Sequence, residues 1–189
     1  NWKGSSDTET VLEAIDLWGI KKVLKILDGM FAFFKYDYEK NNFFLARDKF
    51  GEKPLYVSND HNQSHFFFSS DLDSLRLHHR FKIDLDHISL QGYLKNGFVP
   101  KERSIYSSIR KLEAGTYSEV DLISRTVTTK KYWNSFEEAL KSRQEPFEGS
   151  YEDASHALIE LLKKKISNQM ISDVPIGSFL SGGIDSSLI

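Results

Sequence analysis

The residues with the clearest chemical potential lie near the end of the sequence, in Ser181-Gly182-Gly183-Ile184-Asp185-Ser186. Two adjacent glycines allow the backbone to come close to an anion and to point successive N–H groups at it. The N-terminus of a following helix adds partial positive charge, and serine hydroxyls can donate to phosphate oxygens. Asp185 would be repelled by a phosphate unless a divalent cation lay between them, so it is a candidate Mg²⁺ ligand. The segment is therefore a candidate phosphate site.

A tight turn between a strand and a helix explains the same residues without any ligand, with Asp185 or Ser186 capping the helix. The segment is not a Walker A loop, because no Gly-Lys-Ser/Thr follows its glycines. Turn chemistry alone leaves the two interpretations equally supported.

Other residues that could do chemistry have simpler structural explanations. Arg47-Asp48 ends an apolar run, and we interpret it as an ion pair that holds a loop rather than as a catalytic pair. His78-His79 lacks a further metal ligand at a useful spacing, so both are interpreted as surface residues. His61 and His65 fit a hairpin loop. Lys163–Lys165 is interpreted as the solvated face of a helix rather than as a binding patch.

A strand and a helix must position the glycine segment. Pro175–Leu180 predicts a buried strand, and a helix is expected to follow Gly183. An earlier helix is expected to start at the capping signature Ser150–Asp153. Its apolar positions recur at helical spacing: Ala154, Ala157, Leu158, Leu161, Leu162, Ile166 and Met170. Residues 134–149 are polar and contain Pro and Gly, with one short helix at 136–140, and they are the best domain boundary.

Residues 1–133 predict a mixed domain of helices and aromatic strands. One helix is expected after the polar cap Ser6–Glu9, and residues 21–27 either extend it or form a second helix. Short apolar runs, bounded by turns such as 37–42 and 59–63, predict strands covered on both faces: Met30–Phe34, Asn42–Ala46, Pro54–Val57 and Ser64–Phe68. Two further strands are expected at Gly115–Leu122 and Arg125–Trp133. Helices are also expected at 72–75 and within 83–94, the latter capped by Asp84 or Asp86 and ending before Gly97.

Composition excludes several classes of protein. The 189 residues carry 25 Lys and Arg against 27 Asp and Glu, so the net charge of −2 gives no basic footprint for a nucleic-acid partner. No apolar run approaches the roughly 20 residues needed to cross a membrane. The sequence contains no cysteine, which removes disulfides, thiolate metal sites and a cysteine nucleophile from these residues. Together these features predict a cytoplasmic globular protein.

The glycine segment resembles the SGGxDS pyrophosphate loop of the ATP-pyrophosphatase superfamily. Together with Asp173–Gly177, it is similar to the corresponding region of glutamine-hydrolysing asparagine synthetases. Further blocks that resemble this family occur in the family's order: Arg47–Tyr56, Phe68–Asp71, Gly92–Leu94, Gly97–Pro100, Ile109–Leu112 and Lys131–Trp133. The resemblance covers nearly all of the sequence.

The resemblance implies an α+β architecture in two parts. Residues 1–133 would form part of an αββα glutaminase domain like those of the Ntn (N-terminal nucleophile) hydrolases. Residues 134–149 would be a linker, and 150–189 the start of a Rossmann-like α/β ATP-pyrophosphatase domain. The sequence is therefore expected to be an internal fragment, with most of the synthetase domain after Ile189. In the family the glutaminase cysteine, the arginine that clamps the glutamine carboxylate and the Asn-Gly of the oxyanion hole lie upstream.

The resemblance also implies roles for individual residues. Asp7 would bind the α-ammonium group of glutamine; capping a helix is its alternative role. The residues implied to bind ATP and pyrophosphate are Leu180, Ser181, Gly182, Gly183, Asp185 and Ser186, with Mg²⁺ at Asp185. The implied reaction activates aspartate, or a related carboxylate, with ATP and then aminates it with ammonia from glutamine. A homodimer is the implied assembly.

Three alternatives remain. Synthetases that close a β-lactam ring lack the cysteine nucleophile. They would need no acid to bind glutamine, so the presence of Asp7 counts against this alternative. Departures from the family pattern at Glu52, Asp71 and Ala114-Gly115 point to a branch that amidates a sugar acid in surface polysaccharides. A non-enzymatic glutamine-sensing module is the least supported alternative, because the residues of the glycine segment that could bind phosphate, Ser181–Asp185, are intact.

Overall fold

The structure is a computed structural model that describes residues 3–4, 6–58, 65–99 and 102–189. It divides into two compact units, Asn1–Glu137 and Glu138–Ile189. The turn expected at 59–63 and Ser64, the first residue of an expected strand, lie outside the described residues. No helix in the described part of the chain is long and apolar enough to cross a membrane.

Two helices open the first unit. Helix α1 (Asp7–Trp18) starts at Ser6, whose hydroxyl accepts a hydrogen bond from the N–H of Thr8 at 3.2 Å. Gly19 ends α1 with a φ of 78°, a conformation that favours glycine, and α2 (Ile20–Ile26) follows directly. The helix expected after Ser6 is confirmed, and the following residues form a separate second helix.

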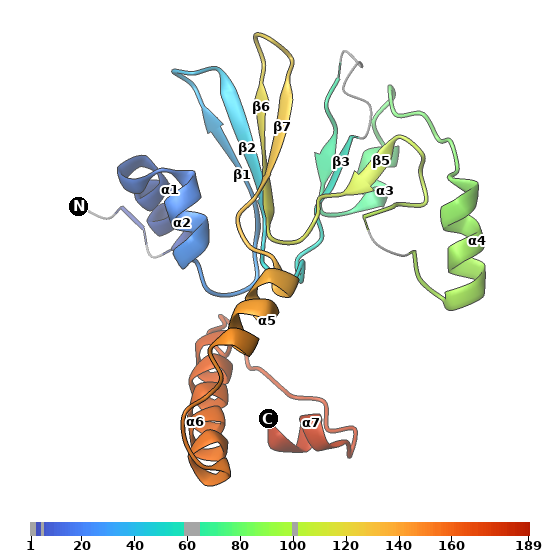
Figure 1. The fold of residues 1–189 in the computed structure, drawn as a ribbon. Helices are drawn as coiled ribbons and strands as arrows, with labels where there is room; N and C mark the ends of the chain where they lie inside the picture. The colour runs from blue at the N-terminus through green and yellow to red at the C-terminus, as the bar shows by residue number, and fades with distance from the viewer. Residues whose placement is uncertain (1–2, 5, 59–64, 100–101) are drawn as a thin grey trace. The chain divides into compact units, whose positions relative to one another are not determined.

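The strands among the described residues form a four-stranded and a three-stranded sheet, both antiparallel, and Figure 1 shows their arrangement. The four-stranded sheet has the order β1-β2-β6-β7, with β1 (Ala32–Asp37), β2 (Asn42–Arg47), β6 (Thr116–Asp121) and β7 (Val127–Lys131). The three-stranded sheet has the order β4-β3-β5, with β3 (Tyr56–Ser58), β4 (Phe68–Ser69) and β5 (Ile109–Lys111). Strands β1 and β2 form a hairpin closed by the pair Asp37 and Asn42, as the turn residues predict.

Side chains alternate along β2 and so fill two different layers of the core. Phe43 and Leu45 pack between the sheets, together with Leu55, Val57, Leu112 and Val120. Phe44 and Ala46 face the opposite side and contact a cluster that contains Leu24 of α2. Strand β2 is therefore covered on both faces, as its continuous apolar sequence predicts.

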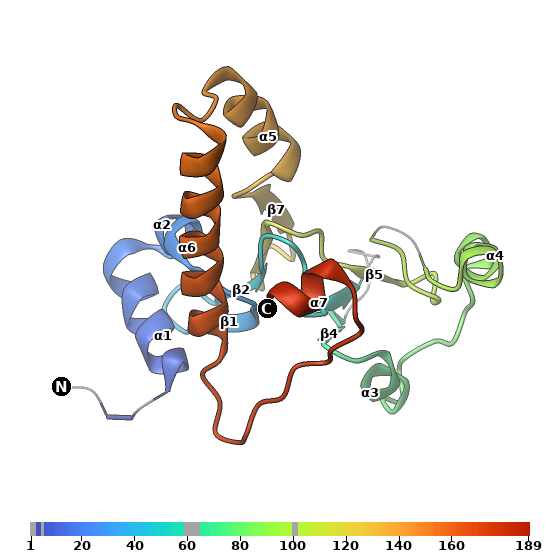
Figure 2. The same cartoon turned by 90° about the horizontal axis from the view of Figure 1, so that it is seen from below.

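The three-stranded sheet has a helix on its outer side. Leu75 of α3 (Leu72–Arg76) packs with Tyr106 and Ile109 on the face of this sheet that points away from β2. Helix α4 (His87–Asn96) follows, with Asp86 as N-cap and Gly97 in the left-handed conformation as C-cap. The first unit thus has helix, sheet, sheet and helix layers, with α1 and α2 on one side and α3 and α4 on the other (Figures 1 and 2).

The second unit is mostly helical. Helix α5 (Ser135–Gln144) spans the division between the units, and α6 (Tyr151–Gln169) begins at a capping box in which Ser150 and Asp153 bond to each other's backbone N–H. Lys163–Lys165 on α6 is exposed, as expected. Helix α7 (Ile184–Leu188) ends the unit.

The buried strand expected at Pro175–Leu180 is wrong. These residues form neither helix nor strand, and all of them are exposed. A strand is stabilised by the ladder it forms with a neighbouring strand, and the second unit contains no other strand to pair with. The apolar run alone did not reveal whether a partner strand was present.

Candidate functional site

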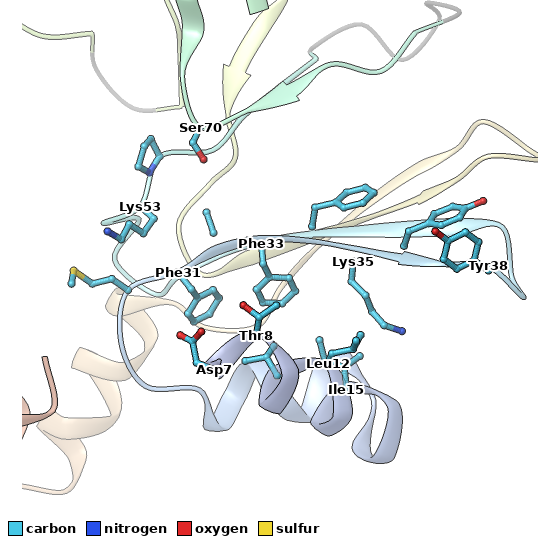
Figure 3. A pocket seen from close by; sticks show the side chains of 16 residues that line it. Asp7, Thr8, Leu12, Ile15, Phe31, Phe33, Lys35, Tyr38, Lys53 and Ser70 are labelled. Atoms are coloured by element: carbon cyan, nitrogen blue, oxygen red, sulfur yellow. The ribbon is translucent and has the colours of Figure 1, made fainter. Parts of the chain in front are cut away.

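A cavity of about 640 Å³ lies between α1 and β1. Asp7 and Thr8 lie at the N-terminal end of α1, beside Phe31 and Phe33 (Figure 3). Most of the lining is apolar, and its polar and charged groups come from well-separated segments: Asp7, Thr8, Lys35, Lys53 and Ser70. A mainly apolar cavity with a few polar groups is the usual form of a small-molecule site.

Asp7 occupies the first turn of α1 and is exposed. Its side chain does not cap the helix, because Ser6 is the N-cap; Ser6 also donates its hydroxyl to Asp7 Oδ1 at 3.3 Å. The helix-cap alternative for Asp7 is therefore wrong. An acidic side chain in the first turn interacts favourably with the partial positive charge of the helix N-terminus. Asp7 thus presents an anionic group at the cavity.

The loop after β2 is held by Arg47 and Asp48, but not through an ion pair between them. No ion pair among the described residues joins these two side chains, so the expected pair is wrong. Arg47 instead donates to three backbone carbonyl oxygens, those of Gly51 at 2.6 Å, Leu112 at 2.7 Å and Lys53 at 2.8 Å. Asp48 is buried and accepts three backbone N–H groups, from Glu52 at 2.9 Å, Lys53 at 3.0 Å and Phe50 at 3.1 Å.

This arrangement fixes the backbone of Lys53 on both sides, since Asp48 accepts its N–H and Arg47 donates to its carbonyl oxygen. Burial lowers the pKa of Arg47, yet an arginine stays charged at neutral pH and keeps donating. Lys53 lines the cavity that Asp7 also lines. The Arg47-Asp48 pair therefore shapes the wall of the candidate site without touching it.

The other side of the same loop is tied to the end of β7. Tyr132 donates its hydroxyl to the carbonyl oxygen of Arg47 at 2.8 Å, and burial raises the pKa of Tyr132 above its ordinary value, so the phenol remains a donor. Gly115 donates its N–H to Asp48 O at 2.8 Å and has a φ of 66°. A Cβ at Gly115 would collide with the carbonyl oxygen of Trp133. Glycine is therefore required at this position.

In the second unit, the glycine segment forms a turn into α7. Gly182 has a φ of 78°, and Gly183 is the N-cap of α7. The hydroxyls of Ser181 and Ser186 lie 3.0 Å apart, and Ser186 also donates to Gly183 O at 3.2 Å. No side chain caps α7, so the alternative in which Asp185 or Ser186 serves as cap is wrong. The structure brings the two serines together beside an uncapped helix start, while Leu180 is exposed before them.

The described residues offer few side chains that could serve as ligands of a metal ion. No group of three or more His, Asp or Glu side chains among them is arranged to hold a metal. Asp185 supplies one exposed carboxylate next to the turn. A single carboxylate suits Mg²⁺ that is shared with phosphate oxygens and water, and it does not suit an ion held by protein side chains alone.

Sequence reasoning missed Lys53 and Ser70 in the lining of the cavity. Both residues lie within or beside blocks that carry the family resemblance, Arg47–Tyr56 and Phe68–Asp71. Nothing in either block indicates that it would meet α1 in space. Only the folded chain brings the three segments to one cavity.

Comparisons with known proteins match both units. The family model of the glutamine amidotransferase domain matches residues 1–133, and the asparagine synthase model matches residues 157–189. Asparagine synthetase (glutamine-hydrolyzing) 1 of Bacillus subtilis is 32% identical over 184 residues, which cover 97% of the chain. Asparagine synthetase (glutamine-hydrolyzing) 2 of the same organism is 33% identical over 195 residues, which cover 100% of the chain. A Methanocaldococcus jannaschii protein with the provisional name asparagine synthetase (glutamine-hydrolyzing) 2 is 34% identical over 190 residues, or 97% of the chain. The chain spans 27%, 25% and 34% of the lengths of these three relatives, respectively.

Proposed function

This chain belongs to the glutamine amidotransferase domain family, and on that premise we propose that it forms part of a glutamine-hydrolysing asparagine synthetase. The observation that carries the proposal is the order of the two family matches in one chain, 1–133 and then 157–189. The first match would belong to the half that releases ammonia from glutamine. The second would belong to the half that activates the acceptor carboxylate.

In the first half, Asp7 would bind the α-ammonium group of glutamine. Its carboxylate lies at a mainly apolar cavity, and Ser6 rather than Asp7 caps the helix. A carboxylate and an ammonium group form a charge-assisted hydrogen bond, which is stronger than a neutral one. The nucleophile of this half would be a cysteine outside the 189 residues, since these contain none.

In the second half, the backbone and hydroxyls of residues 180–186 would hold the pyrophosphate group of ATP. ATP would supply the energy for amide formation by converting the carboxylate of aspartate, or of a related acceptor, into an acyl-adenylate. The uncapped start of α7 and the paired hydroxyls of Ser181 and Ser186 support this role. Asp185 would share a Mg²⁺ ion with the phosphates, which reduces the repulsion between them.

The finer architecture is part of the same proposal. The helix, sheet, sheet and helix layers of the first unit support an Ntn-hydrolase-like αββα domain over 1–133. A linker over 134–149 and the start of a Rossmann-like domain over 150–189 complete the assignment. A cytoplasmic location and a homodimer accompany it as proposals.

The 189-residue chain alone is expected to release no ammonia from glutamine, because it lacks a cysteine to attack the side-chain amide. The measurement is ammonia production from glutamine, with a known glutaminase as positive control and buffer as background. Turnover above background would mean that another residue is the nucleophile and would contradict the proposed division of labour.

Asp7→Asn is expected to raise the KM for glutamine about 10- to 100-fold in the whole enzyme, because a charge-assisted hydrogen bond contributes roughly 1.5–3 kcal/mol. Synthesis with free ammonia should not change, since it bypasses the glutamine site. The measurement is amide formation with each nitrogen source.

Glu13→Gln is the matched control, because Glu13 is an exposed acid on the same helix that does not line the cavity. It should leave both nitrogen sources unaffected. If Asp7→Asn slowed both reactions equally, or left the KM for glutamine unchanged, Asp7 would not bind the ammonium group.

A further inference from the structure

Helix α1 is anchored to the rest of the first unit in its C-terminal half. Ile15 is the buried residue of α1, with 6% of its surface exposed. The next residue, Asp16, forms an ion pair with Lys35 of β1, in which Asp16 Oδ1 lies 2.9 Å from Lys35 Nζ. Figure 3 shows Lys35 reaching from β1 toward the part of the helix that carries Ile15. The ion pair therefore joins the helix to the strand beside its buried residue.

The N-terminal half of α1 stands over the cavity instead. Asp7, Thr8 and Leu12 are exposed, and all three line the cavity of about 640 Å³ that separates this part of the helix from β1. Glu9 accepts the backbone N–H groups of residues 3 and 4 at 2.8 and 2.7 Å. These bonds hold the helix to the segment before it and not to the sheet. The orientation of this half thus depends on the anchor further along the helix.

The distance from the anchor to Asp7 makes its position sensitive to small movements. Asp7 lies nine residues before Asp16, or about 13.5 Å along the helix axis at about 1.5 Å per residue. A tilt of about 10° at the anchor would move Asp7 by roughly 2 Å over that length. Hydrogen bonds form within a narrow range of about 2.7–3.2 Å between donor and acceptor. A tilt of this size would therefore decide whether Asp7 can bind a ligand.

Lys35 needs an acidic partner because its side chain is largely buried. It is 13% exposed, whereas the side chain of Asp16 is 59% exposed. Alternation along β1 places Lys35 on the same face as Phe33, which packs against the cluster that contains Leu24 of α2. A charged amine among apolar side chains costs free energy unless it is paired. The pair with Asp16 therefore directs this amine toward α1.

Asp37 is a second acid on the same face of β1, and it also senses the charge of Lys35. Its pKa lies below the ordinary value, mainly because it accepts the backbone N–H of Lys40, and the charges of Lys40 and Lys35 contribute. The N–H of Lys40 lies 3.1 Å from Asp37 Oδ1, and its Nζ lies 3.6 Å from Oδ2. Since Asp37 belongs to β1 itself, it cannot join the strand to the helix.

We propose that Lys35 and Asp16 form a positioning pair, which fixes α1 on β1 and so sets where Asp7 stands over the cavity. This inference rests on the proposed binding of glutamine by Asp7. Asp16 does not line the cavity. It lies about 13.5 Å from Asp7 along the helix, which exceeds the Debye length of about 8 Å at physiological salt. The pair therefore acts through the position of the helix and not through its electric field.

The first test measures the attachment of α1 by amide hydrogen exchange in this chain. Asp16→Asn and Lys35→Met should each speed exchange in α1 by about 2- to 5-fold, the effect of losing a partly exposed ion pair. Exchange in α4 should stay unchanged as an internal control. Lys35→Met should not lower the thermal midpoint, because an apolar side chain in place of a buried charge is often neutral or stabilising. Unchanged exchange in α1 in both variants would overturn the inference.

The second test measures the KM for glutamine in the whole enzyme. Asp16→Asn and Lys35→Met should each raise it about 3- to 10-fold, because a displaced Asp7 keeps its charge but meets the ammonium group with poorer geometry. The double variant should match the single ones, since both substitutions break the same interaction. Synthesis with free ammonia should not change. Asp37→Asn is the matched control and should leave the KM unchanged, because Asp37 senses Lys35 without contacting α1.

Asp7→Asn, measured beside these variants, separates this inference from the proposed function. If Asp7→Asn raised the KM while both single variants left it unchanged, the positioning role would be wrong and the glutamine site would stand. Additive increases in the double variant would show that Lys35 and Asp16 act separately, which would also overturn the pair. If Asp7→Asn itself left the KM unchanged, the proposed glutamine site would fail, and the positioning role would fail with it.

Discussion

Gly182→Val is expected to abolish ATP-dependent amide synthesis in the whole enzyme. Gly182 has a φ of 78°, which lies in a region of backbone conformation that β-branched residues strongly avoid. A valine at this position would therefore distort the turn that leads into α7. Loss of one preorganised donor to a developing negative charge typically costs about 100- to 1,000-fold in rate. A displaced loop would remove several donors at once. The measurement is pyrophosphate release with ammonia as the nitrogen source.

The neighbouring glycine provides a matched comparison. Gly183 has an ordinary φ of −77°, and a Cβ there would lie 3.5 Å from Ser181 Oγ and 3.9 Å from Ser186 Oγ, which are normal contacts. Gly183→Val should therefore fold, yet it should also abolish synthesis if phosphate approaches the backbone closely. If the loop were only a turn, Gly182→Val would fail and Gly183→Val would work. That pattern would contradict the phosphate site.

Asp185→Asn separates charge from shape at the same loop. No side chain caps α7, so the substitution removes no helix cap. We expect folding to persist and pyrophosphate release to fall severely, because the carboxylate would no longer share Mg²⁺ with the phosphates. Glutamine hydrolysis should survive at least in part in all three variants, since that chemistry would lie in the other half. A native rate of pyrophosphate release in Asp185→Asn would remove its metal role.

Sequence reasoning succeeded where the determining interactions are local. Ser6, Asp86 and Ser150 each begin a helix as their capping chemistry predicts, and Gly97 ends one in the left-handed conformation. A cap involves residues within one turn of each other, so the signal is contained in a few consecutive positions. The turn at the glycine segment is local in the same sense.

Prediction failed where the partner of a segment lies far away in the sequence. Residues 175–180 have the apolar sequence of a strand, but their unit contains no second strand for them to pair with. Strand β5 was not predicted, because two of its three residues are cationic, yet it pairs with β3. Strand formation depends on such distant pairing more than on intrinsic preference. The cavity follows the same rule, because its polar groups at Asp7, Lys53 and Ser70 come from three segments.

Arg47 and Asp48 show why adjacent opposite charges need not form an ion pair. Successive side chains at the end of a strand point to opposite sides. Arg47 reaches carbonyl oxygens in two loops, while Asp48 faces the N–H groups of the residues that follow it. The sequence correctly indicated that the pair holds a loop, but it did not reveal that the partners are backbone groups.

Asp48→Ala is expected to lower the free energy of unfolding of this chain by roughly 3 kcal/mol or more. The carboxylate is 1% exposed and accepts three backbone N–H groups, and a hydrogen bond to a charged acceptor typically contributes about 1.5–3 kcal/mol. Because small domains are stable by only about 5–15 kcal/mol, the loss would be a large part of the total. The measurement is urea denaturation followed by circular dichroism.

Two further variants decide whether this loss arises from the Asp48 hydrogen bonds. Asp48→Asn keeps the oxygen that can accept from the N–H groups of Phe50 and Glu52, but it turns an NH₂ group toward the N–H of Lys53. Its free energy of unfolding should therefore lie between that of the native chain and that of Asp48→Ala. Asp73→Ala removes an acid that is 84% exposed and paired only on the surface, and it should change stability by no more than about 0.5 kcal/mol. Equal stability of Asp48→Ala and Asp73→Ala would show that the loop does not need its buried acceptor. A stability that falls from the native chain to Asp48→Asn and then to Asp48→Ala would instead follow the number of backbone N–H groups that each side chain can accept.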